Sequence, residues 1–382
     1  MLARAAGSIA SMKITKLETF FVKPRWVFLK MHTDEGLVGW GEPIVEGWSR
    51  TTAMAVEEMG RYLIGQDPRR IEHHWQAIYR GAFYHGGPVL TSALSGLEQA
   101  MWDITGKSLG VPVHQLLGGA VRERIRVYGQ VHGETLGDYV ASGRANLEQG
   151  FTMVKTCPFG AAEFIESPSF VNKAVEAVAS LRKAAGDRLQ IALDFHGRLS
   201  PALAIRLCKE LEPYQPMFVE EPCLPEDVDA LACVARATSI PIATGERLFT
   251  KWGFREVLEK RAAAILQPDV SHAGGIWEVR KIAAMAESYF CAIAPHCPLG
   301  PIALAACLQV DACTPNFVCQ EHVCLGEGYL KKPFVIERGY IATPSGPGLG
   351  IEVDEDAVRA KLYDGGWENP RLWHEDGSLA DW

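Results

Sequence analysis

Acidic and other polar residues recur at nearly constant intervals through the middle of the chain. Asp194, Glu220 and Glu246 follow one another at steps of 26 residues, and each closes a short apolar or β-branched run. Three further runs end in polar residues at steps of 23, 27 and 25: Asp269, His296 and Glu321. A strand, a helix and two short loops occupy about that length in a parallel β/α unit. The pattern predicts an α/β barrel with these side chains at the carboxyl ends of its strands, where barrel enzymes build their sites.

The same spacing predicts eight barrel strands. They begin with Ile125–Gln130 and Met153–Cys157 and end with Phe317–Gln320. Apolar residues at helical spacing predict helices between the strands. These helices cover Leu136–Glu148, Asn172–Ala185, Pro201–Leu211, Pro225–Ala237, Lys251–Glu259, Ile276–Ser288 and Gly300–Val310.

A different organisation precedes and follows the barrel. Three strands with short turns, and then three helices, predict an α+β unit over residues 12–122. Its elements are Lys13–Val22, Val27–Thr33, Leu37–Gly41, Thr51–Ile64, Ile71–Tyr79 and Val89–Leu109. The barrel then spans residues 123–330. The segment 331–382 is rich in Gly, Pro and charged residues, and its Trp367, Trp373 and Trp382 predict that it packs back on the N-terminal unit.

Composition excludes several functional classes. The net charge of −8 leaves no basic stripe for nucleic acid. No apolar run approaches the roughly 18 residues that a membrane span needs. The ten cysteines all lie at or after Cys157 and form no C-x-x-C pair, so we expect reduced thiols in a cytoplasmic protein.

The first eleven residues are small and weakly basic. They lack the long apolar core of a secretory signal, so we do not expect one. Met12 opens the first predicted strand, and the segment before it is expected to be a disordered tail or the product of a wrongly assigned start.

The acids at three neighbouring strand ends predict a metal site. Asp194, Glu220 and Glu246 offer only oxygen ligands, which suit Mg²⁺, whereas zinc would require His or Cys at these positions. A single strand-end acid is more often a helix cap or a salt-bridge partner. Three at matched positions favour metal ligation.

Two histidines follow the same pattern. His196 lies two residues beyond Asp194, so strand alternation predicts that it faces the same mouth. Asp269 ends the strand before His296 and can fix its tautomer. Either histidine alone would be read as a core or capping residue, but two beside a metal site indicate an acid–base pair. We expect Glu321, in protonated form, to donate a hydrogen bond to developing charge. A plain salt bridge is the alternative.

Several motifs resemble those of the enolase superfamily, in its mandelate racemase subgroup and, within that, the D-galactonate dehydratases. The resemblance runs from Met12 to Trp382. It rests on Leu193–Gly197, Glu220–Pro222, Gly245–Arg247, Leu266–Asp269, Ser271–Gly275 and Ala294–Pro301. It implies an α+β capping domain, completed by the C-terminal segment, on a (β/α)₇β barrel. It also implies Mg²⁺ held by Asp194, Glu220 and Glu246, and a homo-oligomer.

The resemblance further implies the reaction of a hydro-lyase on an acid sugar. His296, oriented by Asp269, would remove the C2 proton, and His196 would protonate the departing 3-hydroxyl. Glu321 would stabilise the enediolate, and the product would be a 2-keto-3-deoxy sugar acid. D-Galactonate is the favoured substrate. The alternatives are another sugar acid such as gluconate, an acid-sugar epimerase, or a barrel that has lost catalysis.

Four residues are expected to contact the substrate. Lys155 matches the first position of the subgroup's Lys-x-Lys element, but Cys157 occupies the second. Racemases have a lysine there, and we expect a polar amide in galactonate dehydratases. Cys157 therefore counts against a two-base racemase and loosens the substrate assignment, because a thiol is a weak hydrogen-bond partner. Arg25 and Trp26 lie in a loop predicted to reach over the barrel mouth.

Overall fold

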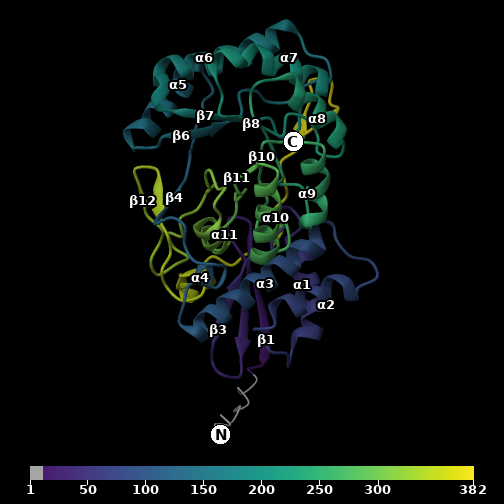
Figure 1. Cartoon of the computed structure of the whole chain (residues 1–382), viewed down its shortest axis with the longest axis vertical. Helices are drawn as coiled ribbons and strands as arrows, with labels where there is room; N and C mark the ends of the chain where they lie inside the picture. Colours follow the sequence, from purple (N-terminus) through teal and green to yellow (C-terminus); the bar gives the residue numbers. More distant parts are fainter. Residues whose placement is uncertain (1–11) are drawn as a thin grey trace.

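The computed structural model describes residues 12–382, so the expectations for residues 1–11 lie outside the described part of the chain. The N-terminal unit is an antiparallel sheet of order β1-β2-β3 covered by three helices. Figure 1 shows this unit, coloured purple and blue, at one end of the molecule. Its elements lie within two residues of the predicted bounds: β1 (Ile14–Val22), β2 (Trp26–Thr33), β3 (Val38–Gly41), α1 (Ser49–Leu63), α2 (Ile71–Gly81) and α3 (Gly87–Leu109).

The barrel contains a parallel sheet of seven strands whose spatial order follows the sequence, from β5 to β11. The strands are β5 (Gly129–Gln130), β6 (Met153–Thr156), β7 (Gln190–Asp194), β8 (Phe218–Glu220), β9 (Ile242–Thr244), β10 (Ile265–Leu266) and β11 (Ala292–Ile293). Residues 317–320 close the circle by single bridges. Val318 N–H donates to Ile293 O, and Gln320 N–H donates to Arg126 O. The predicted (β/α)₇β barrel is confirmed, with its last strand reduced to these bridges.

Seven helices follow the strands and agree closely with the helical spacing. They are α5 (Leu136–Glu148), α6 (Pro168–Ala185), α7 (Pro201–Leu211), α8 (Val228–Ala237), α9 (Thr250–Glu259), α10 (Ile276–Ser288) and α11 (Pro301–Cys313). The two starts that differ most are set by caps. Ser167 Oγ accepts from Phe170 N–H, so α6 begins earlier than predicted. Asp227 accepts from the N–H groups of Asp229 and Ala230, so α8 begins later.

The predicted first barrel strand is divided in two. Its start forms β4 (Arg124–Arg126), which pairs antiparallel with β13 (Tyr340–Ala342) outside the barrel, and only β5 joins the parallel sheet. β13 also pairs with β12 (Ile336–Glu337). Short helices lie at α4 (Val113–Leu116) and α12 (Glu355–Arg359). The division could not be read from composition, because the partner strand lies more than 200 residues away in the sequence.

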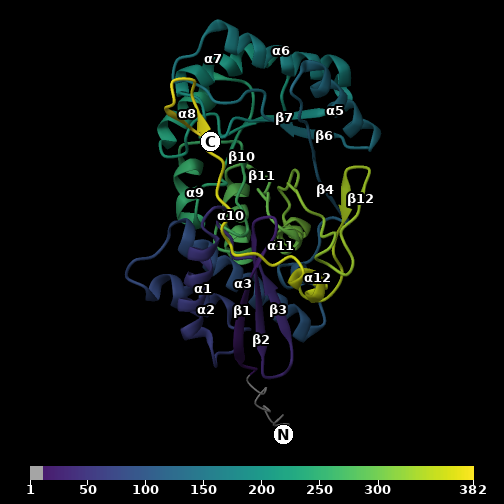
Figure 2. The ribbon, with the colours of Figure 1, turned by 180° about the vertical axis from the view of Figure 1, so that it is seen from behind.

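The C-terminal segment has two destinations. Residues near 361–364 contact the N-terminal unit, where Lys23 N–H donates to Lys361 O and Tyr363 N–H donates to Phe21 O. The chain then leaves that unit and ends in the hairpin of β14 (Leu372–Trp373) and β15 (Leu379–Ala380). Figure 2 shows this yellow stretch running along the barrel to the C-terminus near α8. The expectation that the whole segment packs on the N-terminal unit was therefore wrong for its last residues.

Two buried glutamates of the N-terminal unit cap barrel helices. Glu98, on α3, accepts from the N–H groups of Ile276 and Trp277, both at 2.8 Å, at the start of α10. Glu42 accepts from the N–H groups of Gly300 at 2.7 Å and Ala303 at 2.9 Å at the start of α11. Free N–H groups and the helix dipole stabilise a carboxylate there. These contacts fix the helices that follow β10 and β11.

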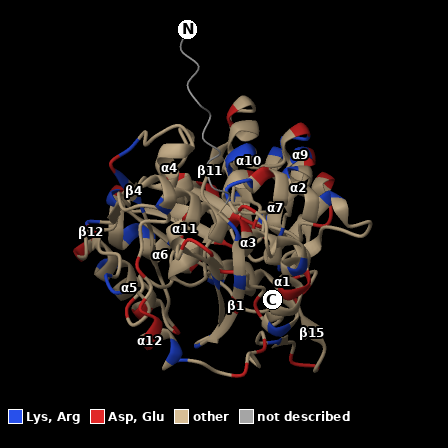
Figure 3. Cartoon of the chain, turned by 90° about the horizontal axis from the view of Figure 1, so that it is seen from below, with Lys and Arg blue, Asp and Glu red and all other residues tan. Residues whose placement is uncertain are grey.

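The surface carries both signs of charge. On the face that Figure 3 shows, Lys and Arg are interspersed with Asp and Glu. None of the helices within residues 12–382 combines the length and hydropathy that a membrane span requires. All ten cysteines are free thiols, and most are buried.

The Glu98 cap should contribute measurably to stability. Glu98→Ala leaves three N–H groups without this acceptor, the backbone N–H groups of Ile276 and Trp277 and the indole N–H of Trp102, and we expect the free energy of unfolding to fall by about 2–4 kcal/mol. Urea unfolding followed by circular dichroism measures this loss. The control is Glu58→Ala on α1, because Glu58 is exposed and pairs only with Arg61. A change of about 0.5 kcal/mol or less is expected there. Equal stability of the two variants would contradict the capping role.

Candidate active site

Three carboxylates meet at the carboxyl ends of adjacent strands. Asp194 ends β7 and Glu220 ends β8, and the two residues are partners in the parallel register. Glu246 follows β9 after Gly245, whose φ is +146°. A Cβ at Gly245 would approach the backbone of Gln267 to 2.8 Å, so glycine is required there. One oxygen from each of Asp194, Glu220 and Glu246 lies within 4.8 Å of the others. We call these residues the acidic triad.

The acidic triad fits a cation held through oxygen. Glu220 is fully buried, and its Oε1 has no hydrogen-bond partner. A buried carboxylate oxygen without a donor is costly unless a cation or water satisfies it. Burial and the nearby Asp194 charge raise the pKa of Glu220 well above its usual value, and burial raises the pKa of Glu246 to about 7. A bound divalent cation would remove both costs.

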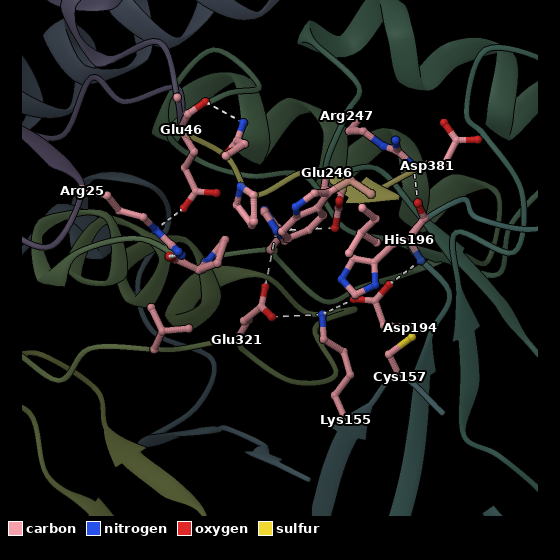
Figure 4. A pocket seen from close by; sticks show the side chains of 18 of the residues that line it. Arg25, Glu46, Lys155, Cys157, Asp194, His196, Glu246, Arg247, Glu321 and Asp381 are labelled. Carbon is pink, nitrogen blue, oxygen red and sulfur yellow. Dashed lines mark hydrogen bonds and ion pairs between the residues drawn. The ribbon is translucent and has the colours of Figure 1, made fainter. Parts of the chain in front are cut away.

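Lys155 on β6 is the buried cation beside this cluster. Its Nζ lies 3.0 Å from Glu220 Oε2, 3.1 Å from Asp194 Oδ2 and 2.9 Å from Glu321 Oε1. Burial opposes the charge, but Glu220 and Glu321 raise the pKa of Lys155 well above its usual value. Figure 4 shows its side chain pointing between Asp194 and Glu321. Lys155 is therefore held as an ammonium and forms ion pairs with these three carboxylates.

Glu321 closes the cluster on the side of the last barrel segment. Its carboxylate accepts from Lys155 and from the Cys297 N–H at 2.9 Å. Burial opposes ionisation, but Lys155 and His296 lower the pKa of Glu321 to about 2. The expectation of a protonated Glu321 is corrected by these contacts, which favour the ionised form. Strand position alone does not reveal Lys155, whose ammonium lies 2.9 Å from Glu321 and decides its ionisation.

His296 and Asp269 form the expected pair. His296 Nδ1 lies 2.8 Å from Asp269 Oδ2, and the Ser271 N–H donates to Asp269 Oδ1 at 2.6 Å. The other ring nitrogen of His296, Nε2, therefore faces the cavity. It lies 3.4 Å from Glu246 Oε2 and 3.8 Å from Glu321 Oε2. Burial lowers the pKa of His296, but Glu246 and Glu321 outweigh it and raise the pKa well above its usual value.

His196 approaches the acidic triad from the end of β7. Its ring Nε2 lies 3.4 Å from Asp194 Oδ2, and its backbone N–H donates to Asp194 Oδ1 at 3.0 Å. The residue has a φ of +51°, so a left-handed turn, rather than strand alternation, aims its ring. Burial lowers the pKa of His196 to about 4. Its location was predicted, but by the wrong backbone geometry.

One cavity of about 1370 Å³ is lined by six of these residues: Lys155, Asp194, His196, Glu246, His296 and Glu321. Of the four expected substrate contacts, Lys155, Cys157 and Arg25 line it. Cys157 Sγ donates to Phe159 O at 3.1 Å, and Arg25 donates to Pro298 O at 3.0 Å. Trp26 was expected in the same group, but it is 4% exposed and packs between Phe28 and Tyr329 instead. Its ring is buried at the start of β2, where it lines a separate cavity.

Other residues at the cavity had no role in the sequence prediction. Arg247 Nη2 donates to His196 O at 3.2 Å and pairs with the carboxylate of Glu221. His272 Nδ1 lies 2.9 Å from Ser92 Oγ on α3. Both stand inside motifs that the sequence analysis quoted, so the signal was present without an assigned role. The C-terminal residues 379–382 also line the cavity, and no motif indicated them.

Comparisons with known proteins agree with this fold and site. A family model described as the mandelate racemase / muconate lactonizing enzyme N-terminal domain matches residues 14–118. A second, described as enolase C-terminal domain-like, matches residues 138–357. Curated D-galactonate dehydratases from Ralstonia nicotianae and Cronobacter sakazakii are each 50% identical over 382 residues, covering 97% of this chain and 100% of theirs.

Solved structures give the same result. A mandelate racemase/muconate lactonizing enzyme from Sulfitobacter sp. superposes with a TM-score of 0.91 at 35% identity, covering 97% of this chain and 100% of that one. A member of the enolase superfamily from Salmonella Typhimurium gives 0.87 at 28% identity, covering 91% and 98%. Both halves of the chain are matched, and the strand-end acids lie where the motifs predicted. The chain therefore belongs to the mandelate racemase / muconate lactonizing enzyme family of the enolase superfamily.

Proposed function

We propose that this protein is a Mg²⁺-dependent dehydratase that converts D-galactonate to 2-dehydro-3-deoxy-D-galactonate and water. The observation that carries the proposal is the pair of histidines in one cavity, one beside Asp194 and the other beside Glu246. This arrangement offers a base and an acid to neighbouring carbons of a substrate bound at the acidic triad. The 50% identity to curated D-galactonate dehydratases supports the choice of substrate.

Asp194, Glu220 and Glu246 would hold the metal. Bound Mg²⁺ would supply positive charge that orients the substrate carboxylate and stabilises the charge developing on it. Lys155 adds a fixed positive charge within 3.1 Å of Asp194, Glu220 and Glu321. Because Glu321 is held ionised, we assign to the fixed positive charge of Lys155, rather than to a protonated Glu321, the stabilisation of negative charge that develops near it.

His296 acts as the base in its neutral form. The Glu246 and Glu321 charges raise its pKa, and a cation held at the acidic triad would offset the Glu246 charge and so favour the neutral form. His296 Nε2 takes the C2 proton, and Asp269 stabilises the imidazolium through Nδ1 at 2.8 Å. His196 acts as the acid in its imidazolium form. Burial disfavours that form, whereas the negative charge of the bound sugar acid and of the developing enediolate favours it, and the proton goes to the 3-hydroxyl as the C3–O bond breaks. Water leaves, and the enol tautomerises to the 2-keto acid. The buried Asp269 carboxylate is 1% exposed, so it holds one ring orientation throughout.

Other readings are less well supported. Racemisation by two bases would need a base at position 157, and burial raises the pKa of the Cys157 thiol instead. A non-catalytic barrel does not account for the intact acidic triad and both histidines. Cys157 lines the cavity, so a different sugar acid such as gluconate remains the second candidate. The homo-oligomer and the cytoplasmic location stay predictions.

A substrate panel tests the proposal directly. Purified protein with Mg²⁺ is given galactonate, gluconate and other acid sugars, and the 2-keto-3-deoxy product is measured. We expect turnover of D-galactonate that a chelator abolishes and added Mg²⁺ restores. Turnover of another acid sugar, but not of D-galactonate, would support the dehydratase reaction and contradict the assigned substrate. No turnover of any acid sugar in the panel would contradict the proposal.

The two histidine roles predict different defects. His296→Ala should abolish exchange of the C2 proton with solvent deuterium, and dehydration should fall by about 10²–10⁴-fold. His196→Ala should also block dehydration but leave exchange detectable, because the base is intact. Exchange is followed by NMR of the recovered substrate. Equal exchange in both variants would show that the roles are wrongly assigned.

The metal assignment predicts weaker binding when one ligand charge is removed. Glu220→Gln should reduce Mg²⁺ affinity by at least about tenfold, measured by calorimetry without substrate. Glu58→Gln on the exposed face of α1 is the matched control and should bind normally. Unchanged affinity in Glu220→Gln would remove Glu220 from the ligand set.

A further inference from the structure

The last residues of the chain form part of the cavity wall. Residues 368–372 and 379–382 line the same cavity as His196 and Glu246. They flank or form the hairpin of β14 and β15, in which Leu372 pairs with Ala380 and Trp373 with Leu379. Figure 4 shows Asp381 on the side of the cavity where Arg247 and His196 lie. We call residues 367–382 the C-terminal wall.

Contacts at both ends hold the C-terminal wall in place. On the side of the N-terminal unit, the Arg25 guanidinium lies 5.2 Å from the ring of Trp367. Asn369 Nδ2 donates to Glu46 O at 3.2 Å. On the barrel side, His374 Nδ1 lies 3.1 Å from a Glu163 carboxylate oxygen in the loop after β6. The segment therefore bridges the two units across the mouth.

Trp382 is the aromatic residue of this wall that reaches the proposed acid. Its ring lies 5.3 Å from that of His196, centroid to centroid, at an interplanar angle of 88°. This edge-to-face packing restricts the imidazole, whose Nδ1 is buried without a hydrogen-bond partner. Trp382 itself is 50% exposed, so part of the indole stays free to contact a ligand.

The proposed function defines what such a ligand presents there. With its carboxylate at the acidic triad, C2 at His296 and C3 at His196, a six-carbon sugar acid extends carbons 4 to 6 beyond His196. Trp382, Asp381 and Arg247 line that side of the cavity. An indole ring packs against C–H groups, while Asp381 and Arg247 offer partners for hydroxyls.

Resting on that function, we propose that Trp382 is a specificity-determining residue. It contacts the sugar-acid chain beyond C3 and selects for a chain of six carbons. The two units of the fold thus share the substrate site with a segment from the far end of the sequence.

Substrates of different length test the proposal. Galactonate is compared with a four-carbon sugar acid of the same C2 and C3 configuration, using full-length protein with Mg²⁺. Trp382→Ala should lower kcat/KM for the six-carbon acid by about tenfold or more, chiefly through KM. The effect on the four-carbon acid should be several times smaller. Trp382→Phe, which keeps an aromatic ring, should recover most of the loss.

The controls separate the possible failures. Trp373→Ala changes a 57% exposed tryptophan of the same hairpin that does not belong to the cavity lining, so kinetics should be unchanged. Equal losses on both substrates in Trp382→Ala, or no loss on either, would overturn the specificity role while the dehydratase reaction stands. A wild-type protein that neither binds nor dehydrates any sugar acid would overturn the proposed function, and this inference with it.

Discussion

The ion cluster around Lys155 is the constraint on which the rest of the site depends. One ammonium is surrounded by three carboxylates within 3.1 Å, and Glu246 adds a fourth nearby. Burying so many charges is unfavourable unless each is paired. The lysine offsets part of the negative charge of the carboxylates, and Glu220 Oε1 is left without a hydrogen-bond partner. A barrel suits this cluster because strands from distant parts of the sequence end side by side, so the charges arrive on rigid backbone.

The N-terminal unit supports this cluster as well as covering it. Helix α3 supplies Glu98 to the start of α10, and it supplies Gln99, whose amide donates to Ser271 Oγ at 3.0 Å. Ser271 in turn donates its N–H to Asp269. A line of hydrogen bonds therefore joins α3 to the carboxylate that orients His296. These hydrogen bonds link the two units at the pair formed by His296 and Asp269, so movement of one unit would displace the other.

Much of this arrangement could be predicted, because regular spacing reports regular structure. The barrel and the acidic triad follow from the repeat of strand-end acids, and most helix bounds follow from apolar residues at helical spacing. The remainder depends on partners far away in the sequence. Arg124–Arg126 pair with β13 outside the barrel. A left-handed turn directs the ring of His196, and Lys155 keeps Glu321 ionised. Trp26 faces the core because of the β2 register, and no periodicity marks the C-terminal wall.

The C-terminal wall has a consequence for how the protein is made. Residues that line the one cavity range from Arg25 to Trp382, nearly the full described length. On a ribosome, the barrel strands emerge long before residues 367–382 do. The acidic triad can therefore assemble while the mouth is still open on that side. Synthesis must therefore reach residues 379–382 before the cavity is enclosed on that side.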